Sequence, residues 1–202
     1  DNILLYGSDF ITEYIDDLKF KIYPNSFFQV NYTQMEKMYQ KALDYAQIRK
    51  DDVVYDLYCG IGSISLLLAK RAKYVYGIEV VPQSIISAKE NAKENNIDNI
   101  EFICGKVENE IKKLTKKAKS PDIIVLDPAR KGCDPIVLDT ILSVSPRKII
   151  YISCNPSTLA RDLKILLENA KYTLEEVTPF DLFCHSTHIE NVVLLLSLIH
   201  IS

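Results

Sequence analysis

From residue 53 onward, short apolar runs alternate with segments in which apolar residues recur every three or four positions. The runs are typical of buried parallel strands, and the periodic segments are typical of amphipathic helices. The expected strand–helix pairs are 53–57 with 62–72, 74–78 with 82–95, 99–103 with 106–117, 123–126 with 134–144, and 148–152 with 157–169. This alternation predicts an α/β fold with a doubly wound, mostly parallel sheet.

Two further expected strands, 172–178 and 191–197, follow each other without a helix between them. A parallel connection needs a crossover, usually a helix, so this last pair is expected to be antiparallel. The sequence therefore predicts seven strands with an antiparallel last strand. Ligands of such sheets bind outside the carboxyl ends of the parallel strands.

The first part of the chain, residues 1–32, shows only short patterns and no core of its own. Residues 18–22 alternate like a strand before a turn signal. We interpret 1–32 as the remnant of a larger neighbouring domain and a lead-in segment, and 33–202 as the main domain. Thr33 is expected to cap a helix that runs to Ala46, with Glu36 completing a capping box.

Composition fits a single α/β domain in a soluble, cytoplasmic chain. No apolar run is long enough to span a bilayer, and no signal segment is expected at the start. The net charge of −3 argues against a protein that binds nucleic acid through an overall positive charge. The lysines of 112–119 are interpreted as a solvated helix face. Five cysteines, without any C-x-x-C pair, predict reduced thiols and no zinc, iron–sulfur or disulfide framework.

A glycine-containing turn, 56–63, follows the first strand of the wound sheet. Gly60 and Gly62 would let a ligand approach backbone N–H groups closely. Glu79, which ends the next strand, is suited to accept both ribose hydroxyls of an adenosine cofactor. Both NAD and S-adenosylmethionine would fit a site made of this turn and Glu79. The methyl donor is favoured, because the turn lacks a third glycine and Asp56 would repel a pyrophosphate.

Asp127 ends the fourth strand and begins the segment Asp-Pro-Ala-Arg-Lys-Gly. It should share one sheet edge with Asp56 and Glu79, which is costly unless the acids serve a ligand. Taken alone, Asp127 is equally well a helix-capping residue before a turn. Arg130 and Lys131 are interpreted either as contacts to a nucleic-acid phosphate or as plain surface charge. In the helix 157–169, Arg161 and Asp162 are expected to pair structurally.

Cys154 stands where the apolar run 149–152 stops and a helix is expected to begin. The free N–H groups of a helix start favour thiolate over thiol, which would make this cysteine nucleophilic. The alternative is a small, inert core residue at a strand end.

Six segments together resemble one family, the RNA 5-methyluridine methyltransferases. These enzymes methylate a uridine of ribosomal or transfer RNA with S-adenosylmethionine. The segments are 27–31 (FFQVN), 56–62, Glu79, 127–132, 153–162 (SCNPSTLARD) and 185–190 (HSTHIE). The resemblance covers nearly the whole chain and implies a Rossmann-like class I methyltransferase fold.

The resemblance also assigns roles. It implies that Cys154 is the nucleophile, adding to uracil C6, and that Glu190 is the base that removes the C5 proton. It implies cofactor contacts for four further residues, namely Gln29, Tyr58, Glu79 and Asp127. An RNA loop or unpaired strand is the implied partner, because C5 and C6 are reached only when the base leaves its stack.

Other interpretations compete with this one. His185, His188 and Glu190 look like a metal triad, but their spacing matches the methyltransferase pattern, whose reaction needs no metal; no metal is expected in this segment. Cys184 is a second thiol near the base and a rival nucleophile. The competing functions are a methyltransferase of a small molecule or protein, a cofactor-binding module without activity and, more remotely, an NAD enzyme. Neither the RNA, the uridine nor the oligomeric state can be inferred.

Overall fold

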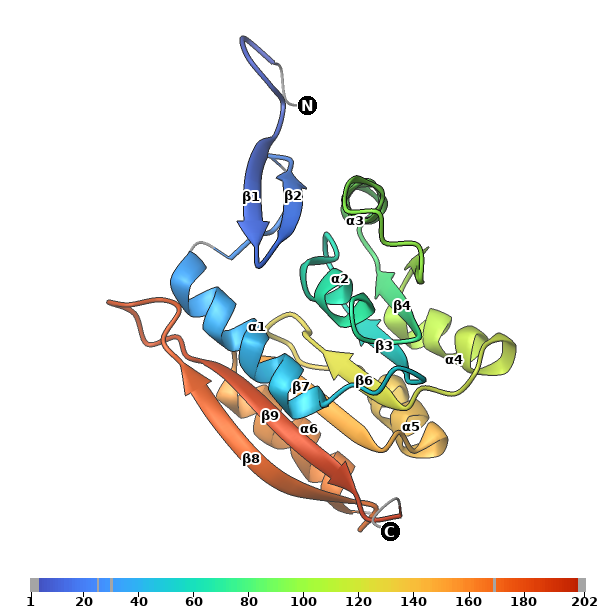
Figure 1. Ribbon diagram of the computed structural model, residues 1–202. Coiled ribbons are helices and arrows are strands. Elements are labelled where there is room, and N and C mark those ends of the chain that lie inside the picture. Colours follow the sequence, from blue (N-terminus) through green and yellow to red (C-terminus); the bar gives the residue numbers. More distant parts are fainter. Residues whose placement is uncertain (1–3, 25, 30, 169, 200–202) are drawn as a thin grey trace.

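The computed structural model describes residues 4–24, 26–29, 31–168 and 170–199. Within these residues, the centre of the molecule is a seven-stranded sheet with helices on both faces (Figure 1). The strands, in chain order, are β3 (Val53–Leu57), β4 (Tyr74–Glu79), β5 (Ile100–Cys104), β6 (Ile123–Leu126), β7 (Lys148–Ser153), β8 (Tyr172–Phe180) and β9 (Glu190–Ser197).

The order of strands across the sheet is β5-β4-β3-β6-β7-β9-β8. Strands β3 to β7 pair in parallel, whereas β9 lies between β7 and β8 and is antiparallel to both. The predicted seven strands and antiparallel last strand are confirmed. The chain reverses its direction of winding between β3 and β6, and such switch points bind ligands in open α/β sheets.

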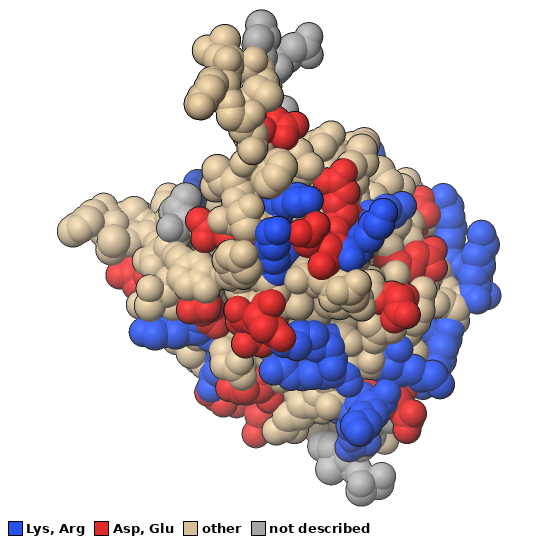
Figure 2. All heavy atoms as spheres, turned by 45° about the horizontal axis from the view of Figure 1, so that its top comes forward, with Lys and Arg blue, Asp and Glu red and all other residues tan. Residues whose placement is uncertain are grey.

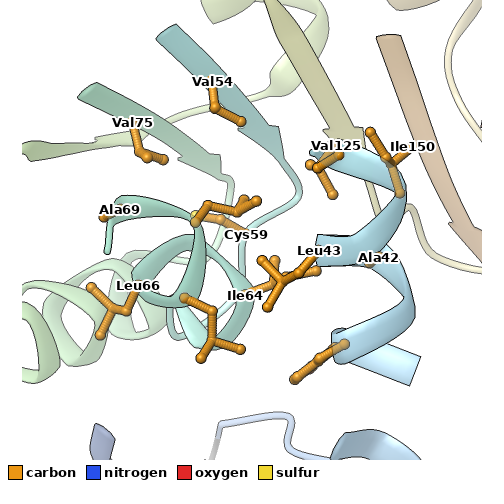
Figure 3. Close-up of a cluster of buried hydrophobic side chains, with 14 of the residues drawn as sticks. Ala42, Leu43, Val54, Cys59, Ile64, Leu66, Ala69, Val75, Val125 and Ile150 are labelled. Atoms are coloured by element: carbon orange, nitrogen blue, oxygen red, sulfur yellow. The ribbon is translucent and has the colours of Figure 1, made fainter. Parts of the chain in front are cut away.

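In the described part of the chain, six helices cover the sheet, three on each face. They are α1 (Tyr32–Ala46), α2 (Ser63–Ala69), α3 (Pro82–Glu94), α4 (Val107–Lys117), α5 (Pro135–Val144) and α6 (Pro156–Glu168). Apolar residues of α1, α2 and α3 pack in one core with Val54 and Val125, whereas α4, α5 and α6 pack in the other with Tyr55 and Ile124. Neighbouring strand residues thus face opposite cores, as the pleat requires. Figure 3 shows the first core, in which helix residues such as Leu43 and Ile64 pack together with strand residues such as Val54 and Val125.

The start of α1 differs from the sequence expectation. Asn31 caps the helix, because its side-chain Oδ1 accepts a hydrogen bond from the backbone N–H of Gln34 at 3.3 Å. Thr33 is already inside the first turn, and Glu36 accepts from the Tyr32 hydroxyl at 2.6 Å instead of closing a capping box. Asparagine caps as well as threonine does, so a cap two residues upstream satisfies the same free N–H groups.

A two-stranded hairpin, β1 (Ile11–Ile15) with β2 (Leu18–Ile22), precedes the main sheet. Only β2 was expected; β1 is mostly exposed and lacks a clear alternation. Figure 1 shows the hairpin standing apart from the large sheet, on the side of α3. Asn91 of α3 and Asn95, which caps the end of α3, accept hydrogen bonds from the backbone N–H groups of Lys21 and Lys19 at 2.9 and 2.8 Å. The division of the chain after residue 32 stays a prediction.

Within the described residues, none of the helices combines the length and the apolar character that crossing a membrane requires.

Candidate active site

Four carboxylates line the edge of the sheet where β3, β4, β6 and β7 end. Glu79 is the last residue of β4, Asp56 lies near the end of β3, and Asp127 directly follows β6. Glu190 begins β9, and because β9 runs antiparallel its first residue lies at this same edge. Ser153 pairs with Asn191, so the next residues outward, Cys154 and Glu190, are neighbours. The structure thus brings Cys154 together with Glu190, Asp127 and Asp56. Glu79 lies beyond Asp56, at the far end of this row of acids.

The turn after β3 is shaped by residues with positive φ. Tyr58, Gly60 and Gly62 have φ of 71, 54 and 84°. The carboxylate of Glu79 accepts from the backbone N–H of Gly60 at 3.2 Å and from that of Val81 at 2.8 Å. The bond from Gly60 connects the turn after β3 to the end of β4, and the two bonds together fix the orientation of the Glu79 side chain.

Gly62 should not tolerate a side chain. A Cβ there would lie 2.9 Å from the ring of Phe102 and 3.3 Å from Cβ of Ala88, at a φ that L-residues rarely adopt. We expect Gly62→Ala to lower the free energy of unfolding by about 2–4 kcal/mol, measured by denaturant titration. Gly60→Ala is the matched control, because its φ is also positive but no described atom lies within 4 Å. It should lose only about 1 kcal/mol from the backbone; equal losses would contradict the clash.

Asp56 is fully buried, and only one of its two carboxylate oxygens has a hydrogen-bond partner among the described residues. Its Oδ2 accepts a short hydrogen bond from the Ser65 hydroxyl, whereas its Oδ1 has no partner among the described residues. Burial raises the pKa of Asp56 to about 7, opposed by the bond from Ser65 and assisted by the charge of Glu79. Gln29 is also buried, and its Oε1 likewise finds no partner in the described part of the chain. A buried acceptor without a partner fits a ligand that brings a hydrogen-bond donor, and at the Asp56 carboxylate such a ligand can also carry positive charge.

The raised pKa of Asp56 predicts a pH-dependent stability. The folded state holds this proton more tightly than the unfolded chain, so the contribution is complete below pH 3.8 and is lost as the pH rises through about 7. The loss should be roughly 4 kcal/mol, because the pKa differs by about 3 between the two states at about 1.4 kcal/mol per pKa unit. Unfolding titrations at several pH values should show a weaker pH dependence for Asp56→Asn. Exposed Asp98 supplies the control variant, Asp98→Asn; an identical pH dependence in both variants would contradict the prediction.

Asp127 and Glu190 lie close enough to affect each other. The pKa of Asp127 is well above its ordinary value, through burial and through the charges of Glu190 and Asp56. Burial raises the pKa of Glu190 to about 7, against a lowering influence of Arg130. The buried phenol of Tyr39, from α1, lies near Asp127 and Asp56. Sequence reasoning missed Tyr39, because its place on the apolar face of a helix is typical of a core residue.

Cys154 is half-buried, and its electrostatic surroundings differ from the expectation. Burial and the charges of Glu190 and Asp127 raise the pKa of its thiol, whereas Arg130 lowers it. Helix α6 begins only at Pro156, so the thiol precedes the first helical turn. The expectation that a helix start lowers this pKa was therefore wrong: burial and two nearby carboxylates outweigh the helix. Arg130 is the cation that acts on both Cys154 and Glu190.

The segment after β6 is fastened to α6. The buried carboxylate of Asp162 accepts from the Cys133 backbone N–H at 2.8 Å and from the Tyr151 hydroxyl at 2.7 Å. Arg161 pairs with Asp162 at 2.6 Å and also donates to the backbone of Lys131 at 3.0 Å, so the predicted structural pair is confirmed. The carbonyl of Arg130 accepts from the side chains of Asn155 and Thr158 at 3.0 and 3.1 Å. These hydrogen bonds therefore join the segment that follows Asp127 to the segment that follows Cys154.

The side chains of Tyr58 and Cys184 lie outside the row of acids. Tyr58 has its backbone at the edge, but its hydroxyl interacts with Cys133, toward α4 and α5. Cys184 is exposed in the loop between β8 and β9. In the motif at 27–31, Val30 lies outside the described residues. No three His, Cys, Asp or Glu side chains gather as metal ligands in the part of the chain that the structure describes.

The sequence matches a family model described as tRNA (Uracil-5-)-methyltransferase over residues 3–198. This chain belongs to that family. It is 48% identical over 195 residues to an uncharacterized RNA methyltransferase of Clostridium tetani, and 52% identical over 189 residues to one of Oceanobacillus iheyensis. These alignments cover 96% and 94% of the chain but only 42% and 41% of the relatives. The chain thus spans about two-fifths of the curated relatives it matches.

Solved structures agree with the family assignment. The tRNA (uracil-54, C5)-methyltransferase of Pyrococcus abyssi, in complex with S-adenosyl-L-homocysteine, is 33% identical and superimposes with a TM-score of 0.81. That match covers 95% of this chain and 45% of the other. TYW2 of M. jannaschii, in complex with AdoMet, shares the fold at 18% identity and a TM-score of 0.64, over 96% of this chain and 88% of the other. The chain therefore has the class I fold of S-adenosylmethionine-dependent methyltransferases.

Proposed function

We propose that this chain is the catalytic part of an RNA (uracil-C5) methyltransferase that uses S-adenosylmethionine and a covalent Cys154 intermediate. The observation that carries the proposal is the pairing of Cys154 with Glu190 at the edge that also holds Asp56, Asp127 and Glu79. A thiol next to a carboxylate of raised pKa provides the nucleophile and the base that C5 methylation of a pyrimidine needs. The family match and the relatives' names support the same reaction class.

The carboxylate row fits a cationic cofactor. Glu79 is oriented toward the glycine turn, and Asp56 and Gln29 each hold a buried acceptor that no described residue satisfies. We assign these residues, together with Asp127 and Tyr58, to S-adenosylmethionine. The bound cofactor would supply an electrophilic methyl group to uracil C5 and leave as S-adenosylhomocysteine. Its positive charge would also relieve the repulsion within the row.

Cys154 begins the proposed reaction. Its thiolate adds to C6 of the uracil ring, forming a carbon–sulfur bond, and the electrons of the C5–C6 double bond move toward O4 as an enolate. C5 becomes nucleophilic in this way. Burial and two carboxylates raise the pKa of the thiol, so we assign Arg130 the role of favouring the thiolate through its positive charge.

Glu190 completes the proposed reaction. After methylation its carboxylate removes the proton from C5, the C5–C6 double bond forms again, and the bond from C6 to the Cys154 sulfur breaks. A base with a pKa of about 7 is largely ionised just above neutral pH and still accepts a proton readily. Burial of Glu190, at 4% exposure, is the cause of this tuning.

The substrate is proposed to be an unpaired uridine of transfer or ribosomal RNA, flipped out of its stack. Basic residues on the face turned toward the hairpin are interspersed with acidic ones (Figure 2). Because phosphate binding depends on clustered Lys and Arg, this face would contribute little to the affinity for long RNA.

A suicide substrate tests the proposal. Fluorine at C5 cannot be removed as a proton, so tRNA and 23S rRNA transcripts containing 5-fluorouridine should trap a covalent complex in the presence of S-adenosylmethionine. The complex should survive denaturing electrophoresis and map to the peptide of Cys154. If no RNA gives an adduct while the chain methylates a small molecule or protein, the alternative methyltransferase is the correct one.

A further inference from the structure

A surface hollow of about 610 Å³ lies between the start of α1 and the loop that joins β8 to β9. We call it the aromatic groove; its lining includes Asn31, Tyr32, Phe183, Cys184, Ser186 and His188. Among the described residues that line it, none is acidic, although acidic residues outnumber basic ones in the chain. Another large hollow, about 530 Å³ beside α1, is lined by Asp16, Glu36 and Asp44 among others.

The aromatic groove borders the reactive centre. Nε2 of His188 lies 3.1 Å from Nη2 of Arg130, the cation that acts on Cys154 and Glu190. The carbonyl of Arg130 in turn accepts from the side chain of Asn155, the residue after the thiol. A ligand in the groove would therefore sit next to a molecule bound at Cys154.

The walls of the groove are connected before any ligand arrives. Nδ2 of Asn31 donates to the carbonyl of Leu182 at 3.3 Å, which joins the start of α1 to the loop. Ser186 donates its hydroxyl to the carbonyl of Phe183 at 2.7 Å and accepts from the backbone N–H of His188 at 3.2 Å. The rings of Phe183 and His188 meet edge to face, with centroids 6.3 Å apart. A groove that is ordered in this way binds with little loss of conformational entropy.

We propose that the aromatic groove binds the base of the nucleotide next to the target uridine in single-stranded RNA, an inference that rests on the proposed function. Aromatic side chains stack with any base, and single-stranded RNA is bound mainly by such stacking. Beyond these bonds, Asn31 keeps one amide hydrogen and Ser186 keeps one acceptor lone pair for a base edge or the ribose. With Arg130 at its border and no carboxylate among its described lining residues, the groove also accepts the phosphate that joins the two nucleotides.

Cys184 provides a direct reporter, because it is exposed and lines the groove. The probe is a stem-loop RNA with one 5-fluorouridine in its loop, compared with the same RNA carrying an abasic site next to that position. After incubation with S-adenosylmethionine, iodoacetamide labelling of each thiol is followed by mass spectrometry. The intact RNA should slow labelling of Cys184 about tenfold, and the abasic RNA should not. Exposed Cys104, at the end of β5, is the internal reference and should react equally in all samples.

A variant gives a second measurement. Phe183→Ala should raise KM for the RNA about 5- to 100-fold, the range expected when one stacked base loses its aromatic partner, with a smaller effect on kcat. Phe183→Tyr should restore KM. Tyr14→Ala, which removes an exposed aromatic ring on β1, is the matched control and should leave KM unchanged.

The outcomes separate this inference from the proposed function. An adduct at Cys154 with Cys184 still freely reactive would overturn the groove assignment and keep the methyltransferase. Protection of Cys184 without an adduct would support the groove and reject the covalent mechanism. Absence of both would overturn both.

Discussion

Replacing Cys154 with serine is expected to abolish the covalent RNA adduct and to lower methyl transfer by at least about 1,000-fold. A serine hydroxyl is far less acidic than a thiol, so it supplies very little of the anion that adds to C6. Denaturing electrophoresis with 5-fluorouridine RNA measures the adduct, and transfer of a labelled methyl group from S-adenosylmethionine measures turnover.

Cys104→Ser is the matched control for this substitution. Cys104 is exposed at the end of β5, and its sulfur lies 3.9 Å from the carbonyl of Val80. Both adduct and turnover should be unchanged in this variant. An adduct that persists in Cys154→Ser and maps to Cys184 would show that the rival thiol is the nucleophile, and the proposed mechanism would be wrong.

Replacing Glu190 with glutamine is expected to separate the two halves of the reaction. Addition of Cys154 to C6 does not need the base, so the adduct should still form, now with unmodified uridine as well. Release requires removal of the C5 proton, so turnover should fall about 100- to 10,000-fold. Loss of tritium from C5-labelled uridine follows the proton directly.

The control for Glu190→Gln is Glu175→Gln, at an exposed position of β8. It makes the same chemical change away from the site and should retain full tritium release. In the wild type, turnover should rise with pH through about 7, because the proposed base, Glu190, can accept a proton only when it is ionised. Unchanged tritium release in Glu190→Gln would assign the base to another group, with Asp127 as the nearby carboxylate to test next.

Much of the fold could be predicted from apolar periodicity alone. Strands β3 and β6 begin and end at the expected residues, because buried runs such as Val53–Leu57 stand between polar turns. Helix α2 is shorter than expected and ends at Ala69, since the chain must turn at once to enter β4. The helix expected over 157–169 begins one residue earlier, at Pro156, and residue 169 lies outside the described part. Strand β1 was missed because it buries little apolar surface.

The candidate site was less accessible to sequence reasoning. That parallel strands end at one edge follows from the alternation, so the proximity of Asp56, Glu79 and Asp127 could be expected. The raised pKa of Cys154 could not be expected, because the direction of the shift depends on burial and on two carboxylates that are distant in sequence. The contact of Arg130 with His188 likewise depends on the loop before β9. The cofactor roles of Gln29, Tyr58, Glu79 and Asp127 and the catalytic roles of Cys154 and Glu190 stay predictions.

The position of β9 between β7 and β8 has a consequence for biosynthesis. The residues proposed to hold the cofactor, up to Asp127, are translated well before Glu190, and the nucleophile also precedes its base by 36 positions in the chain. A nascent polypeptide could assemble the five parallel strands β3 to β7 and still lack Glu190, the carboxylate proposed to release the product. In the proposed mechanism, a chain that lacks β9 would still form the covalent bond to RNA through Cys154, but it would have no Glu190 to release the product.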